Sequence, residues 1–377
     1  MLLLLFGVGL NHLVIHFIDY PVYDLAGLKV LHGQALDLYD LKRTTPGGYY
    51  YPYFFAFVFS LLSYIGYAGK IAFYILFCLS YLKILKFSVD NSLKLVGEKD
   101  PKYRYLIYSI TLLATSYAAS DGFMNANIAI FLMVLSIYAY ELKDRYPVVA
   151  GALMAAAVVF KIYPALILCF FIWEKHWKMV LSSFIFIIFF YLGLPLLVNG
   201  YADGMVLLRN QYTVLSNFGS HWPLNSTVFQ NLTATMLRAF PGLETKHILI
   251  PSLLIIFVAF LPSFLKKKEE VRDSFRLKMF FLILALTPIL TPVSWYNMAL
   301  FYAPVIAYMI CLSVIKKDRF VTTMTAAYII MFCMTTPGIL GNRINDMLEF
   351  YAVPFIGVVL MLFAYIVRIK RDDDVSL

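Results

Sequence analysis

Long apolar runs recur along the whole chain, separated by short polar segments. Runs such as 248–265, 320–334 and 351–367 contain no charged residue. About 20 mostly apolar residues form a helix long enough to cross the hydrocarbon core of a bilayer. The pattern therefore predicts an all-α polytopic membrane protein, which has no room for a sizeable water-soluble core.

The apolar runs predict about twelve transmembrane helices. The first run lacks a basic leader and a small-residue cleavage site, so we expect it to be retained as a span. The expected spans are 2–18, 70–86, 105–119, 127–141, 147–160, 163–173, 179–198, 248–265, 278–290, 297–315, 320–335 and 350–367.

Two segments leave the topology open, and basic residues help to choose because they concentrate in inner loops. Segment 53–67 either spans or lies in the outer interface, and segment 147–173 forms either one kinked helix or two short ones broken near Lys161. With 53–67 in the interface, 147–173 as a hairpin and both termini inside, most of the 31 basic residues lie inside. Changing both segments moves two basic loops outside, and this is the second arrangement that we keep.

The composition excludes several functional classes. Hydrophobic residues make up 62% of the chain and charged residues only 14%, and the mean hydropathy is +0.78. This composition excludes a soluble secreted enzyme and a nucleic-acid-binding module. The net charge of +9 reflects the basic residues of the inner loops, which orient a membrane protein, and not the binding of a polyanion. The four cysteines stand alone in apolar stretches, and no carboxylates have metal-binding spacing, so we expect neither a metal nor a cofactor.

We expect one integral membrane domain over 1–377, with outer regions at about 19–69 and 199–247. No internal repeat or inverted symmetry of the kind found in secondary transporters is evident. Because the two outer regions are substantial, functional residues are expected on the outer, extracytoplasmic face.

Ionisable and polar groups at membrane depth are the first candidates for a site, because they are costly there. Asp19 ends the first run and is a candidate base, with capping of a helix that begins near Pro21 as the alternative. Lys161 interrupts an apolar hairpin, where it either binds a lipid phosphate or extends to the interface. Asn127 begins the next span, and substrate contact and helix capping are equally open to it.

The later outer segments supply polar and aromatic groups suited to sugar hydroxyls and phosphate. A polar loop is often only solvated and a tryptophan often anchors an interface, so these remain candidates. They are Arg209, His221 and Asn225 in 199–247, Trp295 and Asn297 in the turn 291–297, and Arg343 in the loop 341–345.

An ordered set of motifs resembles glycosyltransferase family 87, of the GT-C superfamily. The motifs are FIDYPVYDLAGLKVLHGQALDLYD, YYYPYFFAF, NANIAIFLMVLSIYAYEL, AGALMAAAVVFKIYPALILCFFIWEKHWK and TPVSWYNMALFYAP. The resemblance implies a GT-C-type helical fold with outer-face interfacial segments. It also implies inverting transfer of a sugar, most commonly mannose, from a polyprenyl-phosphate donor.

The resemblance also implies roles for single residues. The acidic residue after the first span is the presumed base, which corresponds to Asp19, and Asn127, Lys161, Asn225 and Trp295 match the later motifs. Many relatives carry a histidine directly after the serine–tryptophan pair, where this chain has Tyr296 and Asn297. A histidine contact to phosphate at this turn is therefore in doubt, and His221 and Arg343 are the expected substitutes.

The sequence thus predicts a transferase that uses a polyprenyl-phosphate-sugar donor and a glycan or glycolipid acceptor in contact with membrane lipid. Asp19 is expected to accept the proton of the acceptor hydroxyl while Lys161 binds the departing phosphate. The competing hypotheses are a membrane transporter or lipid flippase, whose polar residues would line a path, and a noncatalytic membrane subunit.

Overall fold

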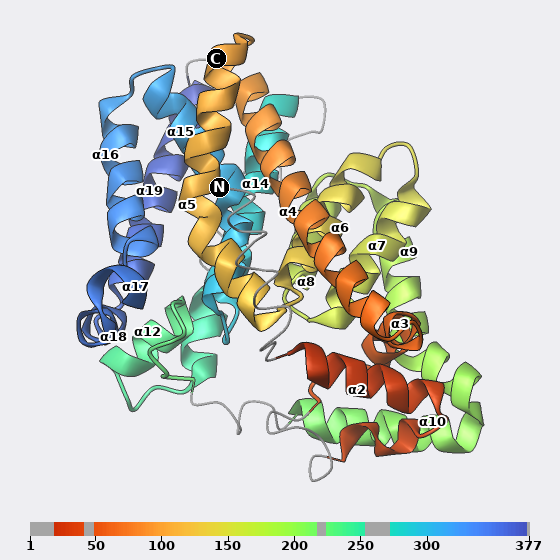
Figure 1. The fold of residues 1–377 in the computed structure, drawn as a ribbon. Coiled ribbons are helices and arrows are strands. Elements are labelled where there is room, and N and C mark those ends of the chain that lie inside the picture. Colours follow the sequence, from red (N-terminus) through yellow and green to blue (C-terminus); the bar gives the residue numbers. More distant parts are fainter. Residues whose placement is uncertain (1–18, 41–48, 217–223, 253–271, 375–377) are drawn as a thin grey trace. The chain divides into compact units, whose positions relative to one another are not determined.

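The computed structural model describes residues 19–40, 49–216, 224–252 and 272–374. Within these ranges the chain is helical and contains no strand, which confirms the predicted all-α class (Figure 1). The expected first span at 2–18 and most of the expected span at 248–265 lie outside the described residues.

The chain divides into two compact units. The first contains residues 1–82 and 120–223, and the second contains residues 83–119 and 224–377. Helices α4 (Tyr67–Val96) and α5 (Pro101–Asn125) carry the chain between them. The expectation of a single membrane domain stays a prediction.

The first unit contains Asp19 and Lys161, which lie at the ends of two of its helices. Its helical chain bends at Gly200, where φ is 77° and only glycine adopts the conformation without strain. The elements are α2 (Tyr20–Leu31), the 3-10 helix η1 (Ala35–Tyr39), α3 (Tyr53–Tyr64), α6 (Ala129–Leu142), α7 (Pro147–Phe160), α8 (Ala165–Trp173), α9 (Trp177–Ile188), the π-helical turn η2 (Phe189–Gly193) and α10 (Leu194–Ser216).

Helices α7 and α9 approach closely because small residues face each other. A Cβ atom added to Gly151 on α7 would lie 2.7 Å from the Met179 carbonyl oxygen and 2.8 Å from Ser182 Oγ. Ser182 Oγ donates in return to the Val148 carbonyl oxygen, 3.1 Å away. This contact fixes α7, the helix that directly precedes Lys161.

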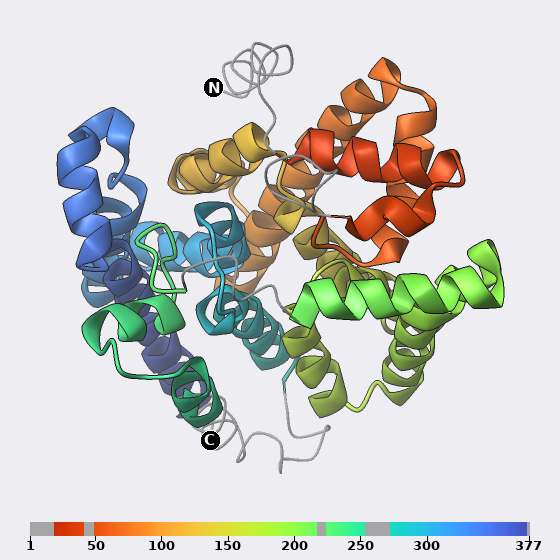
Figure 2. The ribbon, with the colours of Figure 1, turned by 90° about the horizontal axis from the view of Figure 1, so that it is seen from below.

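Helix α2 packs beside α3 (Figure 2). Small residues and aromatic rings form the contact. Gly27 has no room for a side chain because Ser63 Oγ occupies that position. Tyr20 and Tyr23 on α2 each meet the Phe59 ring on α3 edge to face, with ring centroids 5.4 Å apart. These contacts fix the start of α2, which follows Asp19.

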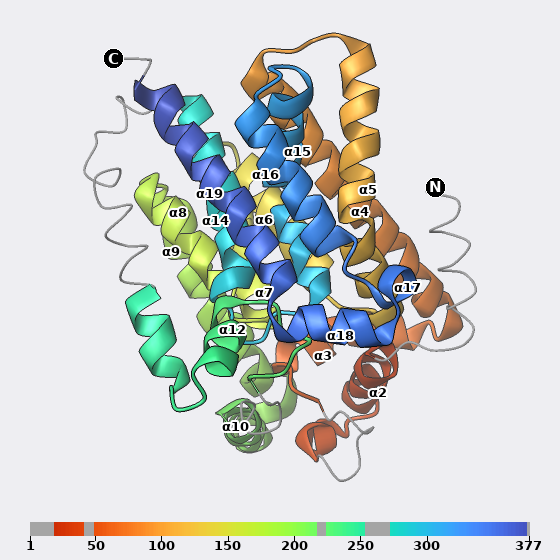
Figure 3. The same ribbon diagram turned by 90° about the vertical axis from the view of Figure 1, so that its left-hand side faces the viewer.

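The second unit is built around α15, whose residues Ala303 to Leu312 are all buried. Tyr365 on α19 donates to the Lys278 carbonyl oxygen of α14 over 2.8 Å, and α18 runs across the end of α19 (Figure 3). The elements are α12 (Leu232–Ala239), α14 (Asp273–Leu290), the 3-10 helix η4 (Tyr296–Tyr302), α15 (Ala303–Val314), α16 (Arg319–Tyr328), the π-helical turn η5 (Ile329–Cys333), α17 (Pro337–Leu340), α18 (Asn342–Phe350) and α19 (Val353–Asp374).

The predicted number of about twelve spans is not confirmed. Among the described residues, four helical stretches are long and apolar enough to cross a membrane, or five if α5 and α6, bent by 117°, form one span. Several expected spans are short helices. A 14-residue helix such as α7 is about 21 Å long at 1.5 Å per residue, less than the bilayer core of about 30 Å.

The two ambiguous segments take defined forms. Segment 53–67 contains the 12-residue helix α3, which is too short to span by itself. Segment 147–173 forms two helices, α7 and α8, interrupted at Lys161, whose backbone is extended at φ −149° and ψ 137°. The predicted break is confirmed.

Candidate active site

Asp19 is the residue before α2, and its side chain does not cap that helix. Pro21 lies in the first turn of α2. Backbone amides in the first turn have no partner within the helix, so the missing N–H of proline costs no hydrogen bond there. The Asp19 carbonyl oxygen accepts the backbone amides of Val22 and Tyr23, and its own amide donates to the Asn125 carbonyl oxygen over 3.2 Å. The backbone thus fixes Asp19 against the end of α5, and its carboxylate is left for other partners.

Two side chains hold the Asp19 carboxylate. Tyr23, one helical turn further along α2, donates its hydroxyl to Oδ2 over 3.2 Å. Asn127 Nδ2 donates to the same oxygen over 3.5 Å. The Tyr51 hydroxyl lies 3.0 Å from the Tyr23 hydroxyl and extends the chain of hydrogen bonds away from Asp19. Tyr23 is completely buried, so its hydroxyl is held in this position.

The Asn127 side chain bonds to the start of α6 and to Asp19, whereas its contact with a substrate stays a prediction. Its Oδ1 accepts the backbone amide of Ala129 over 3.0 Å, at the start of α6. That bond identifies which end of the amide is oxygen and directs Nδ2 toward Asp19. Asn127 therefore binds the first amide of α6 and the candidate base at the same time.

Lys161 enters the site from the end of α7. Its extended backbone stops the helix, and α8 begins only after Pro164. Lys161 Nζ lies 5.5 Å from the centroid of the Tyr51 ring, within cation–π range. Lys161 also interacts electrostatically with Asp19. The structure therefore brings Asp19, Asn127 and Lys161 together within the first unit.

Burial shifts both ionisable groups toward their neutral forms. Burial raises the pKa of Asp19 above its usual value, and the Lys161 charge and the Tyr23 hydrogen bond only partly oppose this. Burial of the ammonium lowers the pKa of Lys161, opposed by Asp19. A carboxylate with a raised pKa is a stronger base, and a poorly hydrated ammonium attracts an anion strongly.

A glutamine fixes the segment that carries Tyr51. Gln211 Oε1 on α10 accepts the Tyr53 backbone amide over 2.8 Å and lies 3.0 Å from the Tyr39 hydroxyl. The Tyr39 hydroxyl also lies 3.0 Å from the Tyr51 carbonyl oxygen. Sequence reasoning missed Tyr23 and Tyr51, and it named Gln211 only among the polar groups of segment 199–247. Only Tyr23 had a local signal, its four-residue spacing from Asp19.

The remaining sequence candidates do not join this group in the first unit. Arg209 is exposed on α10, and His221 lies outside the described residues. The others belong to the second unit, in which Asn297 is buried and Trp295 meets Phe229 with ring centroids 5.1 Å apart. Asn225 and Arg343, also in the second unit, are exposed.

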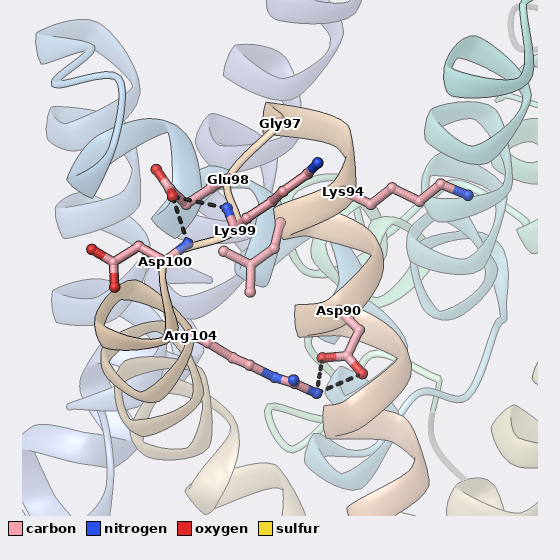
Figure 4. A pocket seen from close by; sticks show the side chains of 8 residues that line it. Asp90, Lys94, Gly97, Glu98, Lys99, Asp100 and Arg104 are labelled. Carbon is pink, nitrogen blue, oxygen red and sulfur yellow. Dashed lines mark hydrogen bonds and ion pairs between the residues drawn. The ribbon is translucent and has the colours of Figure 1, made fainter.

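A pocket of about 470 Å³ lies where α4 meets α5 in the second unit (Figure 4). Arg104 there pairs with Asp90 over 3.0 Å, and Glu98 accepts the backbone amides of Lys99 and Asp100. None of the predicted site residues lines this pocket. We therefore do not take this pocket as the candidate active site.

The first-unit group therefore consists of a carboxylate and an ammonium beside hydroxyl and amide donors. Among the described residues, no three His, Cys, Asp or Glu side chains gather in a metal-binding arrangement. A base next to a cation suits a displacement in which a hydroxyl is deprotonated and an anion leaves.

Comparison with known proteins assigns the chain to a family. The sequence model of glycosyltransferase family 87 matches residues 49–337, more than half of the chain. Neither the curated proteins nor the solved structures gave a match. Asn127 and Lys161 lie inside the matched range and Asp19 lies before it. With a match of this extent, the chain belongs to glycosyltransferase family 87, and the resemblance seen in its motifs is confirmed.

Proposed function

We propose that this glycosyltransferase is inverting and moves mannose from a polyprenyl-phosphate donor to a hydroxyl of a glycan or glycolipid at the extracytoplasmic membrane face. The observation that carries the proposal is the meeting of Asp19, Asn127 and Lys161 around Tyr23 and Tyr51. Membership of family 87 gives the reaction class, which is glycosyl transfer. The three residues provide a carboxylate base, an amide donor and a cation for that reaction.

Asp19 acts as the general base. Its carboxylate takes the proton of the acceptor hydroxyl while that oxygen attacks the anomeric carbon, and the bond from this carbon to the phosphate oxygen breaks. Attack and departure on opposite faces invert the configuration in one step. A positioned base contributes about 10²- to 10⁴-fold in rate, and Tyr23 and Asn127 orient the carboxylate for it.

Lys161 stabilises the phosphate as it leaves. Negative charge grows on the departing oxygen, and a buried ammonium next to that charge is worth more than one in water. Ile162, the next residue, is 77% exposed. An exposed apolar side chain beside a phosphate-binding amine suits a donor whose isoprenoid chain remains in lipid.

The test is a transfer assay with the purified full-length chain, synthetic polyprenyl-phosphate [¹³C]mannose and octyl α-D-mannopyranoside as the acceptor probe. We expect transfer of the sugar with the anomeric configuration opposite to that of the donor, read by NMR at the labelled carbon. Retention of configuration would contradict the single displacement. Movement of intact donor across vesicle membranes without sugar transfer would favour a flippase.

A further inference from the structure

Helix α18 directs polar side chains into the protein and apolar side chains outward. Asn345 and Glu349, one turn apart, are buried, and the Tyr296 hydroxyl donates to Glu349 Oε1 over 2.8 Å. Asn345 Nδ2 donates to the same oxygen over 2.9 Å. Gln230 Nε2 donates to the Glu349 carbonyl oxygen over 3.2 Å. Hydrogen bonds therefore attach the polar side of α18 to the rest of the second unit.

The opposite side of α18 is an exposed apolar stripe. Ile344, Met347 and Tyr351, which directly follows the helix, are 49%, 51% and 66% exposed. The partly exposed Leu348 belongs to the same stripe, because residues three, four and seven apart share one side of a helix. A helix that faces water has the reverse arrangement, with its apolar side chains against the protein. The stripe therefore indicates that this side of α18 faces something other than water.

The position of α18 at the end of a candidate membrane span indicates what covers the stripe. The stretch Val353–Arg371 of α19 is long and apolar enough to cross a bilayer. Helix α18 runs across the end of α19 (Figure 3), and the chain turns between them at Ala352, whose φ of 56° lies in the left-handed region. With 9 residues, α18 is about 14 Å long and too short to cross by itself. These features are those of a helix that lies near the bilayer surface.

The stripe on α18 continues into a second apolar stripe on α19. The large apolar side chains Ile356, Val359, Phe363 and Ile366 are exposed there. Their spacing of three and four residues places them on one side of α19. Exposed apolar surface of this extent on a candidate span is typical of contact with lipid. Since Ile356 follows Tyr351 by only five residues, lipid that contacts α19 also reaches α18.

Two charged residues complete the pattern of an interfacial helix. Arg343 and Asp346 are exposed and lie along one edge of the stripe, between it and the buried polar side. An arginine beside apolar surface extends its guanidinium toward lipid headgroups while its stem stays on the apolar surface. Helices with an apolar side and a charged side lie in the plane of the interface, with the apolar side among the acyl chains.

We propose that α18 lies in the plane of the membrane interface and that its stripe of Ile344, Met347, Leu348 and Tyr351 inserts among the acyl chains of bilayer phospholipids. The partner is the leaflet that borders the N-terminal end of α19. This contact involves the second unit alone and does not depend on the proposed transfer reaction. Residues 342–351 lie beyond the range matched by the family model, so the match does not account for them.

The test is photo-crosslinking of the full-length chain in vesicles of palmitoyl-oleoyl phosphatidylcholine and phosphatidylglycerol. The photoreactive residue p-benzoylphenylalanine replaces Met347 or Ile344 in the stripe, Phe363 on α19 as the lipid-facing reference, or Asp346 as the matched control on the same helix. Mass spectrometry then measures the fraction of each peptide that carries a phospholipid adduct. We expect Met347 and Ile344 to give adducts as Phe363 does, roughly fivefold more than Asp346.

Three results would overturn the inference. Equal adducts at Asp346 and Met347, or adducts at Phe363 alone, would place the stripe outside the acyl chains. Crosslinks from Met347 to peptides of the same chain would show that another segment covers the stripe. Loss of the phospholipid adducts on addition of undecaprenyl phosphate would identify a polyprenyl chain as the occupant in place of bilayer lipid.

Hydroxyl-radical footprinting of the unmodified chain provides a second measurement, which needs no substitution. Met347 is half exposed in the protein alone, so it oxidises readily if water covers α18. In the same vesicles we expect its oxidation to be roughly fivefold slower than that of N-acetylmethionine amide in the surrounding solution. Oxidation of Met347 at a rate close to that of the free amide would contradict insertion into lipid.

Discussion

Replacing Tyr23 with Phe removes one hydrogen bond from the Asp19 carboxylate and leaves the buried ring in place. The bond is 3.2 Å long and partly buried, although Tyr23 itself is completely buried. A hydrogen bond to a charged group contributes about 1.5–3 kcal/mol, and this long one belongs at the lower end. Since 1.36 kcal/mol corresponds to one pKa unit, its loss should raise the pKa of Asp19 by about one unit.

The sign of the pH effect follows from the role of Asp19 as a base. Only the ionised carboxylate accepts a proton, so activity is lost as the pH falls through its pKa. Burial already raises this pKa above that of an ordinary aspartate. In Tyr23→Phe the acidic limb of kcat/KM should therefore move about one pH unit upward, with about tenfold less activity below the limb and little change on the plateau.

The assay is sugar transfer from the labelled donor, measured across pH in buffers of constant ionic strength. Tyr49→Phe is the matched control, because Tyr49 is equally buried but donates to the Pro52 carbonyl oxygen. Its acidic limb should not move. An unmoved limb in Tyr23→Phe, or the same loss of activity at every pH, would refute the assignment of Tyr23 as a positioning residue for Asp19.

Three further predictions concern the cation, the packing and the topology. Lys161→Met should weaken donor binding at least tenfold and Lys161→Arg should restore part of it, measured by equilibrium binding of labelled donor; unchanged affinity would show that Lys161 only extends to the interface. Gly151→Ala should destabilise the chain by about 1–3 kcal/mol through overpacking against Ser182, seen as a lower thermal midpoint, whereas an unchanged midpoint would contradict the close contact of α7 and α9. A single cysteine at Lys94 should react with membrane-impermeant reagents only from the inner side, and labelling from outside would favour the second topology.

The sequence pointed to Asp19 and Lys161 because few ionisable side chains interrupt the apolar runs. Their partners were harder to find. Tyr51 is one of 28 tyrosines, and its hydroxyl meets Tyr23 from another helical segment. Asn127 meets Asp19 across 108 residues. No local spacing predicts such contacts, since tertiary packing creates them.

The number of spans was the part of the fold that the apolar pattern predicted least well. Hydropathy locates α7 and α8 and the break at Lys161, but it does not indicate whether a short apolar helix crosses the bilayer. The length of the helix decides whether it crosses, and a helix of 9 to 14 residues is too short to cross the bilayer core by itself. Burial within the protein explains the apolar character of α15 equally well.

The most direct test of the account is a single-turnover transfer experiment with Asp19→Asn, alongside equilibrium binding of the same labelled donor. Asn preserves the shape of the side chain but does not accept the proton, so we expect donor affinity within about threefold and a transfer rate at least 10²-fold lower. The control Asp24→Asn, one turn into α2, should retain both. Near-normal transfer by folded Asp19→Asn would contradict the claim that this carboxylate is the catalytic base.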